Sequence, residues 1–344
     1  MYFSYFLSSY MPDAAYGGKR VYADMLDQAL AAEKLGYRGV AIPEHHLINI
    51  LMVPSPLQMA VKIATLTHRI EIMTSVVVLP IRDVRILAGE IVQAHALCDE
   101  RLIVGVGRGA FPYETARLGA PLETTRERFD ESLAILEALT TRQDVSWNGK
   151  YYRFEPITVM PRPAAPIPFV IAAVSADGIY HAAKRGYHVQ TTPLSGSHEV
   201  LLQQVDAFRR GKEEAGEAGR NLRLSLQRGI YAARDETDAR QKVALAYDYY
   251  KRFDNIKGPG IVHGGMIAPL PREQTQEELA INLLIGTSPE LVDRLSVYAE
   301  LGIDEVLAPC GYGQSAGETL EMMHRFAEEV MPHFRAPTRA FGST

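Results

Sequence analysis

The chain has 344 residues, of which 47% are hydrophobic and 22% are charged. A chain of this length and composition can bury a large core without disulfides or structural metal. The formal net charge of −5 and the isoelectric point near 6.1 argue against nucleic acid or an anionic membrane as the main partner.

The two cysteines, Cys98 and Cys310, could pair, but so few in a long chain favour free thiols and a cytoplasmic protein. The apolar start, residues 1–7, lacks a basic segment and predicts a strand rather than a signal peptide. No apolar run in the sequence approaches the roughly 18 residues of a membrane span.

Short β-rich runs alternate with amphipathic helical patterns, as in βα units around a parallel sheet. Strands are predicted at residues 2–7, 38–42, 70–78, 102–107, 169–174, 187–191, 223–232 and 305–309. Several are apolar on both faces, as a strand between a barrel core and outer helices must be. Three helices end in a glycine just before a strand, at Gly36, Gly186 and Gly302. We therefore expect one (β/α)8 TIM barrel over residues 1–344.

Two insertions interrupt this alternation, after the fourth and the seventh strand. The first includes a hairpin around Asn148-Gly149, a dipeptide suited to a two-residue type I′ turn. The second, residues 255–278, is rich in glycine and proline and is predicted to be a mobile lid, with a plain surface loop as the alternative.

Glu44-His45-His46 follows the second strand, at the barrel end where active sites form. Neighbouring strand residues point to opposite sides, so we expect one histidine to face the pocket and to exchange protons near neutral pH. The alternatives are a histidine bound to backbone groups or a metal ligand, although the spacing differs from the helical zinc motif.

Two further motifs suggest an anion site. Gly105, Gly107 and Arg108 end the fourth strand, where the glycines would let a ligand approach and the arginine suits phosphate. Ser175 opens a helix after the fifth strand, where free N–H groups attract phosphate or the serine simply caps the helix. Together, these motifs predict one phosphate held between Arg108 and Ser175.

With these motifs in this order, the chain resembles the luciferase-like monooxygenases, the group that contains the bacterial luciferase α subunit. The similar segments are residues 32–37, 44–46, 74–80, 101–109, 169–186 and 329–332. The resemblance covers nearly the whole chain and is weakest over residues 255–278.

The resemblance implies roles for individual residues. His45 is the expected catalytic residue, and a cis peptide bond is expected between Ser75 and Val76, beneath the flavin ring. The remaining expected cofactor-binding residues are Glu44, Arg108, Gly109, Ala110, Ser175, Ala176 and Gly178. Gly107 stands where luciferase has a reactive cysteine, so neither a thiol there nor light emission is implied.

The implied activity is that of an FMN-dependent monooxygenase. Reduced FMN from a separate flavin reductase would react with O2 to a flavin C4a-peroxide that oxidises a small organic substrate, and the protein would be a homodimer without metal. The alternatives are an F420-dependent oxidoreductase of the same fold, a non-catalytic flavin-binding protein, and a metal-dependent barrel hydrolase.

Overall fold

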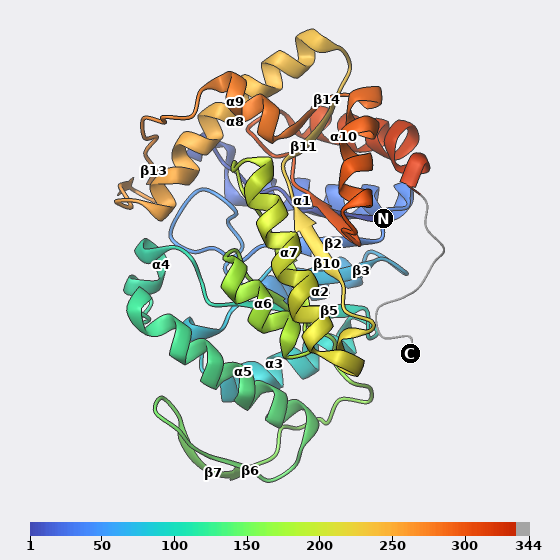
Figure 1. Ribbon diagram of the computed structural model, residues 1–344. Helices are drawn as coiled ribbons and strands as arrows, with labels where there is room; N and C mark the ends of the chain where they lie inside the picture. Colours follow the sequence, from blue (N-terminus) through green and yellow to red (C-terminus); the bar gives the residue numbers. More distant parts are fainter. Residues whose placement is uncertain (335–344) are drawn as a thin grey trace.

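The predicted strand regions assemble into one closed barrel of parallel strands surrounded by helices (Figure 1). The computed structural model describes residues 1–334. The barrel strands, in the order of their pairing, are β1 (Tyr2–Phe6), β2 (Gly39–Ile42), β3 (Glu71–Thr74), β5 (Leu102–Gly107), β8 (Phe169–Ala172), β9 (His188–Thr191), β10 (Leu224–Gln227) and β15 (Glu305–Ala308). β15 pairs with β1 and closes the ring, and every neighbouring pair is parallel. The (β/α)8 prediction is confirmed.

Helices cover the outside of the barrel because crossover connections between parallel strands run along its outer face. They are α1 (Gly18–Leu35), α2 (Pro56–Ala64), α3 (Val84–Leu97), α4 (Pro112–Arg117), α5 (Thr125–Thr141), α6 (Ala176–Lys184), α7 (His198–Glu214), α8 (Glu236–Lys257), α9 (Gln276–Asn282), α10 (Ser288–Glu300) and α11 (Ala316–Arg325). Gly36, Gly186 and Gly302 have positive φ angles of 82°, 85° and 77° and so end their helices as predicted. Among the helices of residues 1–334, none is long and apolar enough to cross a membrane.

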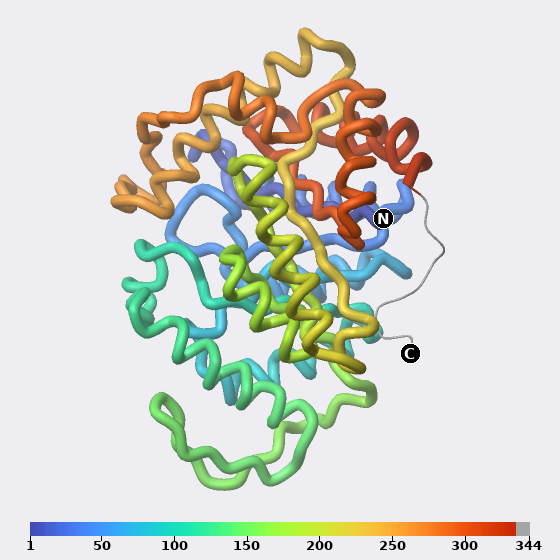
Figure 2. Tube along the Cα trace, viewed as in Figure 1, coloured from blue at the N-terminus to red at the C-terminus, as the bar shows by residue number. Residues whose placement is uncertain are grey.

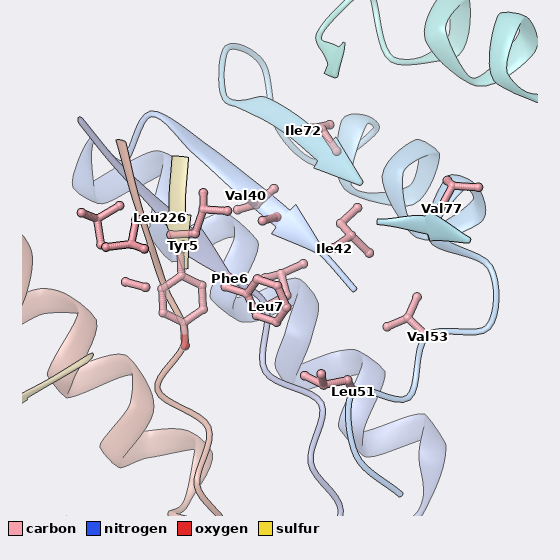
Figure 3. Close-up of a cluster of buried hydrophobic side chains, with 14 of the residues drawn as sticks. Tyr5, Phe6, Leu7, Val40, Ile42, Leu51, Val53, Ile72, Val77 and Leu226 are labelled. Atoms are coloured by element: carbon pink, nitrogen blue, oxygen red, sulfur yellow. The ribbon is translucent and has the colours of Figure 1, made fainter. Parts of the chain in front are cut away.

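Large side chains from several strands fill the barrel. Tyr5 and Phe6 of β1 and Ile42 of β2 are at most 2% exposed and lie in one cluster in Figure 3. Cys98 and Cys310 are also buried, and both are free thiols, as predicted. The core is therefore apolar and does not depend on a disulfide.

The insertion between β5 and β8 carries the predicted hairpin, which extends beyond α5 at the lower end of Figure 1. Its strands are β6 (Val145–Asn148) and β7 (Arg153–Ile157). The predicted two-residue turn is wrong: Asn148 pairs with Arg153, so the turn has four residues. The Glu131 carboxylate of α5 favours this longer turn, because it accepts hydrogen bonds from the N–H groups of residues 150–152 at 3.0–3.2 Å.

The second insertion begins inside the region predicted as one strand, residues 223–232. The chain leaves the barrel after β10, and β11 (Ile230–Ala233) pairs in parallel with β14 (Leu284–Thr287) outside it. Gly229 lies at the break, where a Cβ atom would be 2.3 Å from the hydroxyl oxygen of Tyr312. The single-strand prediction is wrong because both the break and the partner strand depend on segments distant in the sequence.

The segment predicted as a lid, residues 255–278, has internal structure. It contains the end of α8, a short antiparallel pair and the start of α9; the pair is β12 (Val262–His263) and β13 (Met266–Ile267). Asn255 is fully buried, and its Nδ2 donates to the carbonyl oxygens of Ile261 and Ala268 at 2.9 and 2.7 Å. A backbone N–H of β13 donates to Oδ1 of Asn49 at 2.9 Å, so the segment lies beside the loop that follows β2 (Figure 2). Its motion as a lid stays a prediction.

Candidate active site

The predicted functional residues lie at one rim of the barrel, where the carboxyl ends of the parallel strands meet. His45 follows β2, the Ser75-Val76 bond follows β3, Arg108 follows β5 and Ser175 follows β8. These four strands are neighbours in the barrel. The structure therefore brings the predicted residues together on one half of the rim.

His45 is oriented by a carboxylate that the sequence motifs did not indicate. Its Nδ1 lies 3.0 Å from Oε2 of Glu114, a buried residue of α4. An ionised carboxylate only accepts hydrogen bonds, so the hydrogen of the neutral ring lies on Nδ1 and Nε2 is the atom that can take up a proton. The ring also stacks on Phe111, with centroids 4.4 Å apart. Glu114 and Phe111 thus fix both the tautomer and the tilt of the imidazole.

Glu44, predicted to bind the cofactor, has both carboxylate oxygens engaged within the protein and is 2% exposed. Oε1 accepts from Nη2 of Arg82 at 2.7 Å and lies 2.8 Å from Nε2 of His46, and Oε2 accepts from the N–H of Val78 at 3.0 Å. The side chains of the two adjacent histidines therefore contact different carboxylates, although the backbone N–H of His46 also donates to Oε1 of Glu114, at 2.6 Å. Glu44 holds β4 (Val77–Val78) in place through its last residue, and its direct contact with a cofactor stays a prediction.

The Ser75-Val76 peptide bond is cis, as predicted. Two glycines of β5 make room for this segment. A Cβ atom on Gly105 would lie 2.0 Å from the carbonyl oxygen of Thr74, and one on Gly107 would lie 2.6 Å from Cγ2 of Val76. These glycines admit the neighbouring strand, which corrects the expectation that they admit a ligand.

A buried amide of β9, which β5 and β8 separate from β3 in the barrel, contacts the same segment. The Gln190 side chain of β9 donates a hydrogen bond to the Ser75 hydroxyl. Gln190 is 4% exposed, and its Oε1 has no hydrogen-bond partner within residues 1–334. A buried acceptor left without a partner costs about 1–3 kcal/mol, which favours a ligand donor at this position.

Arg108 is exposed and forms no ion pair with the described part of the chain. Partial burial and the neighbouring charge of Arg126 lower the pKa of its guanidinium. Two arginines close together without an acid create a positive potential that attracts an anion. The sequence indicated Arg108 but not Arg126.

Ser175 is the N-cap of α6, and its Oγ accepts a hydrogen bond from the N–H of Gly178 at 3.2 Å. Because β5 and β8 are paired, this helix start lies next to the end of β5 that carries Arg108. The N–H of Gly178 is engaged in this cap, and its predicted contact with an anion stays a prediction. The N–H groups of Ala176 and Asp177 have no acceptor within the helix and point toward its N-terminal side.

Gly109 and Ala110 complete the predicted phosphate-binding set. Gly109 has a φ of 78°, and a Cβ there would lie 2.9 Å from Cγ1 of Val78, so the turn itself requires glycine. Ala110 is exposed beside it. Anion contacts from these two residues stay predictions. Neither here nor elsewhere in residues 1–334 do three His, Cys, Asp or Glu side chains gather in a way that could hold a metal ion.

Four residues of the site were not predicted from the sequence, and each belongs to a different segment from the predicted residue that it affects. They are Arg82, Glu114, Arg126 and Gln190. Glu114 had a weak signal, an acidic residue in the first turn of a helix after a barrel strand. The others lie in no motif, and only the fold brings them to the rim.

A family model described as luciferase-like monooxygenase matches residues 1–305 of the chain. The chain belongs to this family. The sequence resemblance is thereby confirmed, and members of the family with solved structures share the barrel. Monooxygenase RslO1 from Streptomyces bottropensis superposes with a TM-score of 0.83 over 97% of this chain and 100% of that protein, at 24% identity. The oxygenating constituent of 3,6-diketocamphane monooxygenase from Pseudomonas putida, in complex with FMN, gives 0.80 over 98% and 100%, at 17% identity.

Among curated relatives, the oxygenase component of the flavin-dependent trigonelline monooxygenase of Acinetobacter baylyi is 28% identical over 92% of this chain and 91% of its own length. The F420-dependent glucose-6-phosphate dehydrogenase of Beutenbergia cavernae is 25% identical over 92% and 94%. These luciferase-like relatives are oxidoreductases that depend on a flavin or a deazaflavin. They support oxidoreductase chemistry and a flavin-type cofactor for this chain.

Proposed function

We propose that this luciferase-like protein is the oxygenase component of a two-component, FMN-dependent monooxygenase. It takes reduced FMN from a separate reductase and uses O2 to oxidise a small organic substrate. One observation carries the proposal. Arg108 and the N-terminus of α6 follow two neighbouring strands, β5 and β8, and both lie on the same half of the rim as His45. The relative that acts on trigonelline as an oxygenase component supports it.

The residues of this half of the rim fit FMN at both ends of the molecule. Arg108, the Ser175 hydroxyl and the N–H of Ala176 are donors suited to its phosphate. The buried Oε1 of Gln190 is an acceptor suited to an N–H of its ring, beside the Ser75-Val76 bond. Reduced FMN, when bound, supplies the electrons that activate O2, so that one oxygen atom enters the substrate and the other leaves as water.

His45 handles the proton that this chemistry requires. Its Nε2 takes up or delivers a proton at the reacting oxygen, and the Glu114 carboxylate stabilises the ring while it is charged. Phe111, which is 4% exposed, covers one face of the imidazole and keeps water from it. His45→Ala should lower turnover about a hundredfold or more while retaining flavin affinity.

The direct test is anaerobic titration of the full chain with reduced FMN, followed by an oxygen pulse in the presence of a substrate panel. The proposal expects saturable binding and oxygen consumption coupled to product. Absence of affinity for reduced FMN would contradict it. Release of hydrogen peroxide without product for every substrate would instead favour a non-catalytic flavin-binding protein.

The second candidate is an F420-dependent oxidoreductase that transfers hydride. The F420-dependent relatives at 23–26% identity support it. Titration with reduced F420 separates the two functions: tight binding of F420, weak binding of FMN and turnover that does not depend on oxygen would replace the monooxygenase proposal.

A further inference from the structure

A narrow cavity lies over the other half of the rim, at the ends of β1, β9, β10 and β15 and beneath α8. Six of its fifteen lining residues are aromatic, namely Phe6, Tyr10, Tyr249, Tyr250, Phe253 and Tyr312. Every described residue that lines it is uncharged. A wall of rings without a carboxylate favours a planar ring as the occupant and gives a simple cation no counter-charge.

The rings of this wall are continuous with the proposed catalytic histidine. Tyr249 contacts Phe253 with ring centroids 6.0 Å apart, and Phe253 contacts Phe111 at 5.7 Å. Phe111 in turn stacks on His45. A molecule in the cavity therefore lies on the far side of Phe253 and Phe111 from the imidazole, and a shift of these two rings joins the cavity to it.

Three residues that line this cavity, Ser8, Ser9 and Tyr312, carry hydroxyl groups without a hydrogen-bond partner in the described part of the chain, and Ser9 and Tyr312 are the most deeply buried of them. The Tyr312 hydroxyl and Ser9 Oγ belong to side chains that are 4% and 1% exposed, and neither has a hydrogen-bond partner within residues 1–334. A buried hydroxyl without a partner costs about 1–3 kcal/mol. Both hydroxyls can donate, so they suit an acceptor group on the occupant.

The surrounding charge favours an acceptor that is negative. Arg228, between β10 and β11, is 2% exposed, and its guanidinium donates to the carbonyl oxygens of Leu194 and Gly196, at 3.1 and 3.0 Å. It has no ion pair with any described carboxylate. Burial raises the pKa of Tyr250 to about 12, and the Arg228 charge opposes this rise. Arg272 is close by, but Asp254 neutralises it at 2.6 Å, which leaves a net positive charge behind the rings.

We propose that this cavity is the substrate site and that it selects a planar aromatic or heteroaromatic carboxylate. The ring of the substrate lies among Tyr249, Tyr250 and Phe253, and its carboxylate accepts hydrogen bonds from Ser9 and Tyr312. The term substrate rests on the proposed monooxygenase function, whereas the binding selectivity stands on the cavity alone.

The size of the cavity sets a condition on binding. Its volume is about 40 Å³, which is room for a water molecule. A benzene ring occupies a protein cavity of roughly 150 Å³. Side chains of α8 must therefore move outward when a ring enters, so binding is expected to change the exposure of α8.

The test is calorimetric titration of the full chain with three probes: benzoate, its neutral isostere benzamide, and the non-planar cyclohexanecarboxylate. Benzoate should bind at least tenfold more tightly than either of the others. Tyr312→Phe and Ser9→Ala should each weaken benzoate binding severalfold without changing benzamide binding. Tyr247→Phe, on α8 but outside the cavity, is the matched control and should bind benzoate like the parent protein.

Equal affinity for benzoate and benzamide, no binding of any probe, or parental benzoate affinity in Tyr312→Phe would each overturn the proposal. A crystal soaked with benzoate that shows only an ordered water between the two hydroxyls would do the same. Reduced FMN titrations on these variants keep the two proposals apart. If the protein binds reduced FMN but does not prefer benzoate, only the assignment of the cavity is refuted. If it prefers benzoate but does not bind reduced FMN, only the monooxygenase proposal is refuted.

Discussion

His45 depends on Glu114 for the position of its ring hydrogen, so the pair can be tested by a change that keeps the size of the partner. A glutamine at position 114 presents either an oxygen or an NH2 group to Nδ1 and removes the negative charge that stabilises the imidazolium. Glu114→Gln should lower kcat about tenfold or more and shift its pH profile. Glu123→Gln, an exposed carboxylate on the same insertion, serves as the control. Unchanged kcat and pH profile in Glu114→Gln would show that Glu114 only packs.

Arg108 is the other residue on which the proposed function depends. A charge-assisted hydrogen bond contributes roughly 1.5–3 kcal/mol, so Arg108→Ala should weaken reduced FMN binding about tenfold to a hundredfold. The measurement is an anaerobic fluorescence titration. Arg142→Ala, an exposed arginine at the end of α5, is the matched control. Equal affinities of the two variants for reduced FMN would show that the phosphate does not bind at the end of β5.

At the scale of elements, the segment 255–278 depends on one buried amide. Asn255→Ala removes the two hydrogen bonds donated to Ile261 and Ala268 and the one accepted from the N–H of Ile261. Hydrogen exchange over residues 258–270 should become at least tenfold faster, while the barrel strands keep their protection. Exchange that speeds up equally in β1 and β5 would mean that the segment unfolds only with the barrel.

The same variant tests whether this segment acts as a lid. A lid that orders over the rim excludes water, so that more of the oxygen consumed ends in product. Asn255→Ala should therefore release more hydrogen peroxide per oxygen consumed. Unchanged coupling, despite faster exchange, would leave the segment as a surface element without a gating role.

Local patterns were sufficient for the elements whose partners are near in sequence or repeat around the barrel. Runs apolar on both faces located the barrel strands, and glycines located helix ends such as Gly36 and Gly186. The departure of β11 from the barrel was not predictable, because it depends on β14 and on Tyr312 against Gly229. The same holds for the site: its motif residues were predictable, whereas Glu114 and Gln190 reach the rim only through the fold.

At the scale of the whole molecule, His188 couples stability to pH. Burial, followed by the charges of Arg223 and Lys212, lowers its pKa from 6.5 to about 4 in the folded protein. Between these values the unfolded chain binds a proton that the folded chain does not, so stability falls as the pH falls from 6.5 to 4. At pH 5 the loss is roughly 2 kcal/mol. His188→Asn keeps an acceptor for the N–H of Arg223 and should lose less Tm between pH 7 and 5 than the parent protein. An identical loss in both proteins would assign the acid sensitivity to other groups.

Assembly is the remaining property of the whole molecule. We propose that the chain forms a homodimer, and light scattering at micromolar concentration should give twice the chain mass of 38.1 kDa. A mass of one chain would contradict it.

The division of the barrel end into two arcs has a practical consequence for protein engineering. In the two proposals, the arc built on β2, β3, β5 and β8 carries the chemistry, and the other arc, which α8 covers, carries the recognition of the substrate. Libraries of substitutions confined to α8 should therefore yield catalysts with new selectivity that still use reduced FMN from the original reductase.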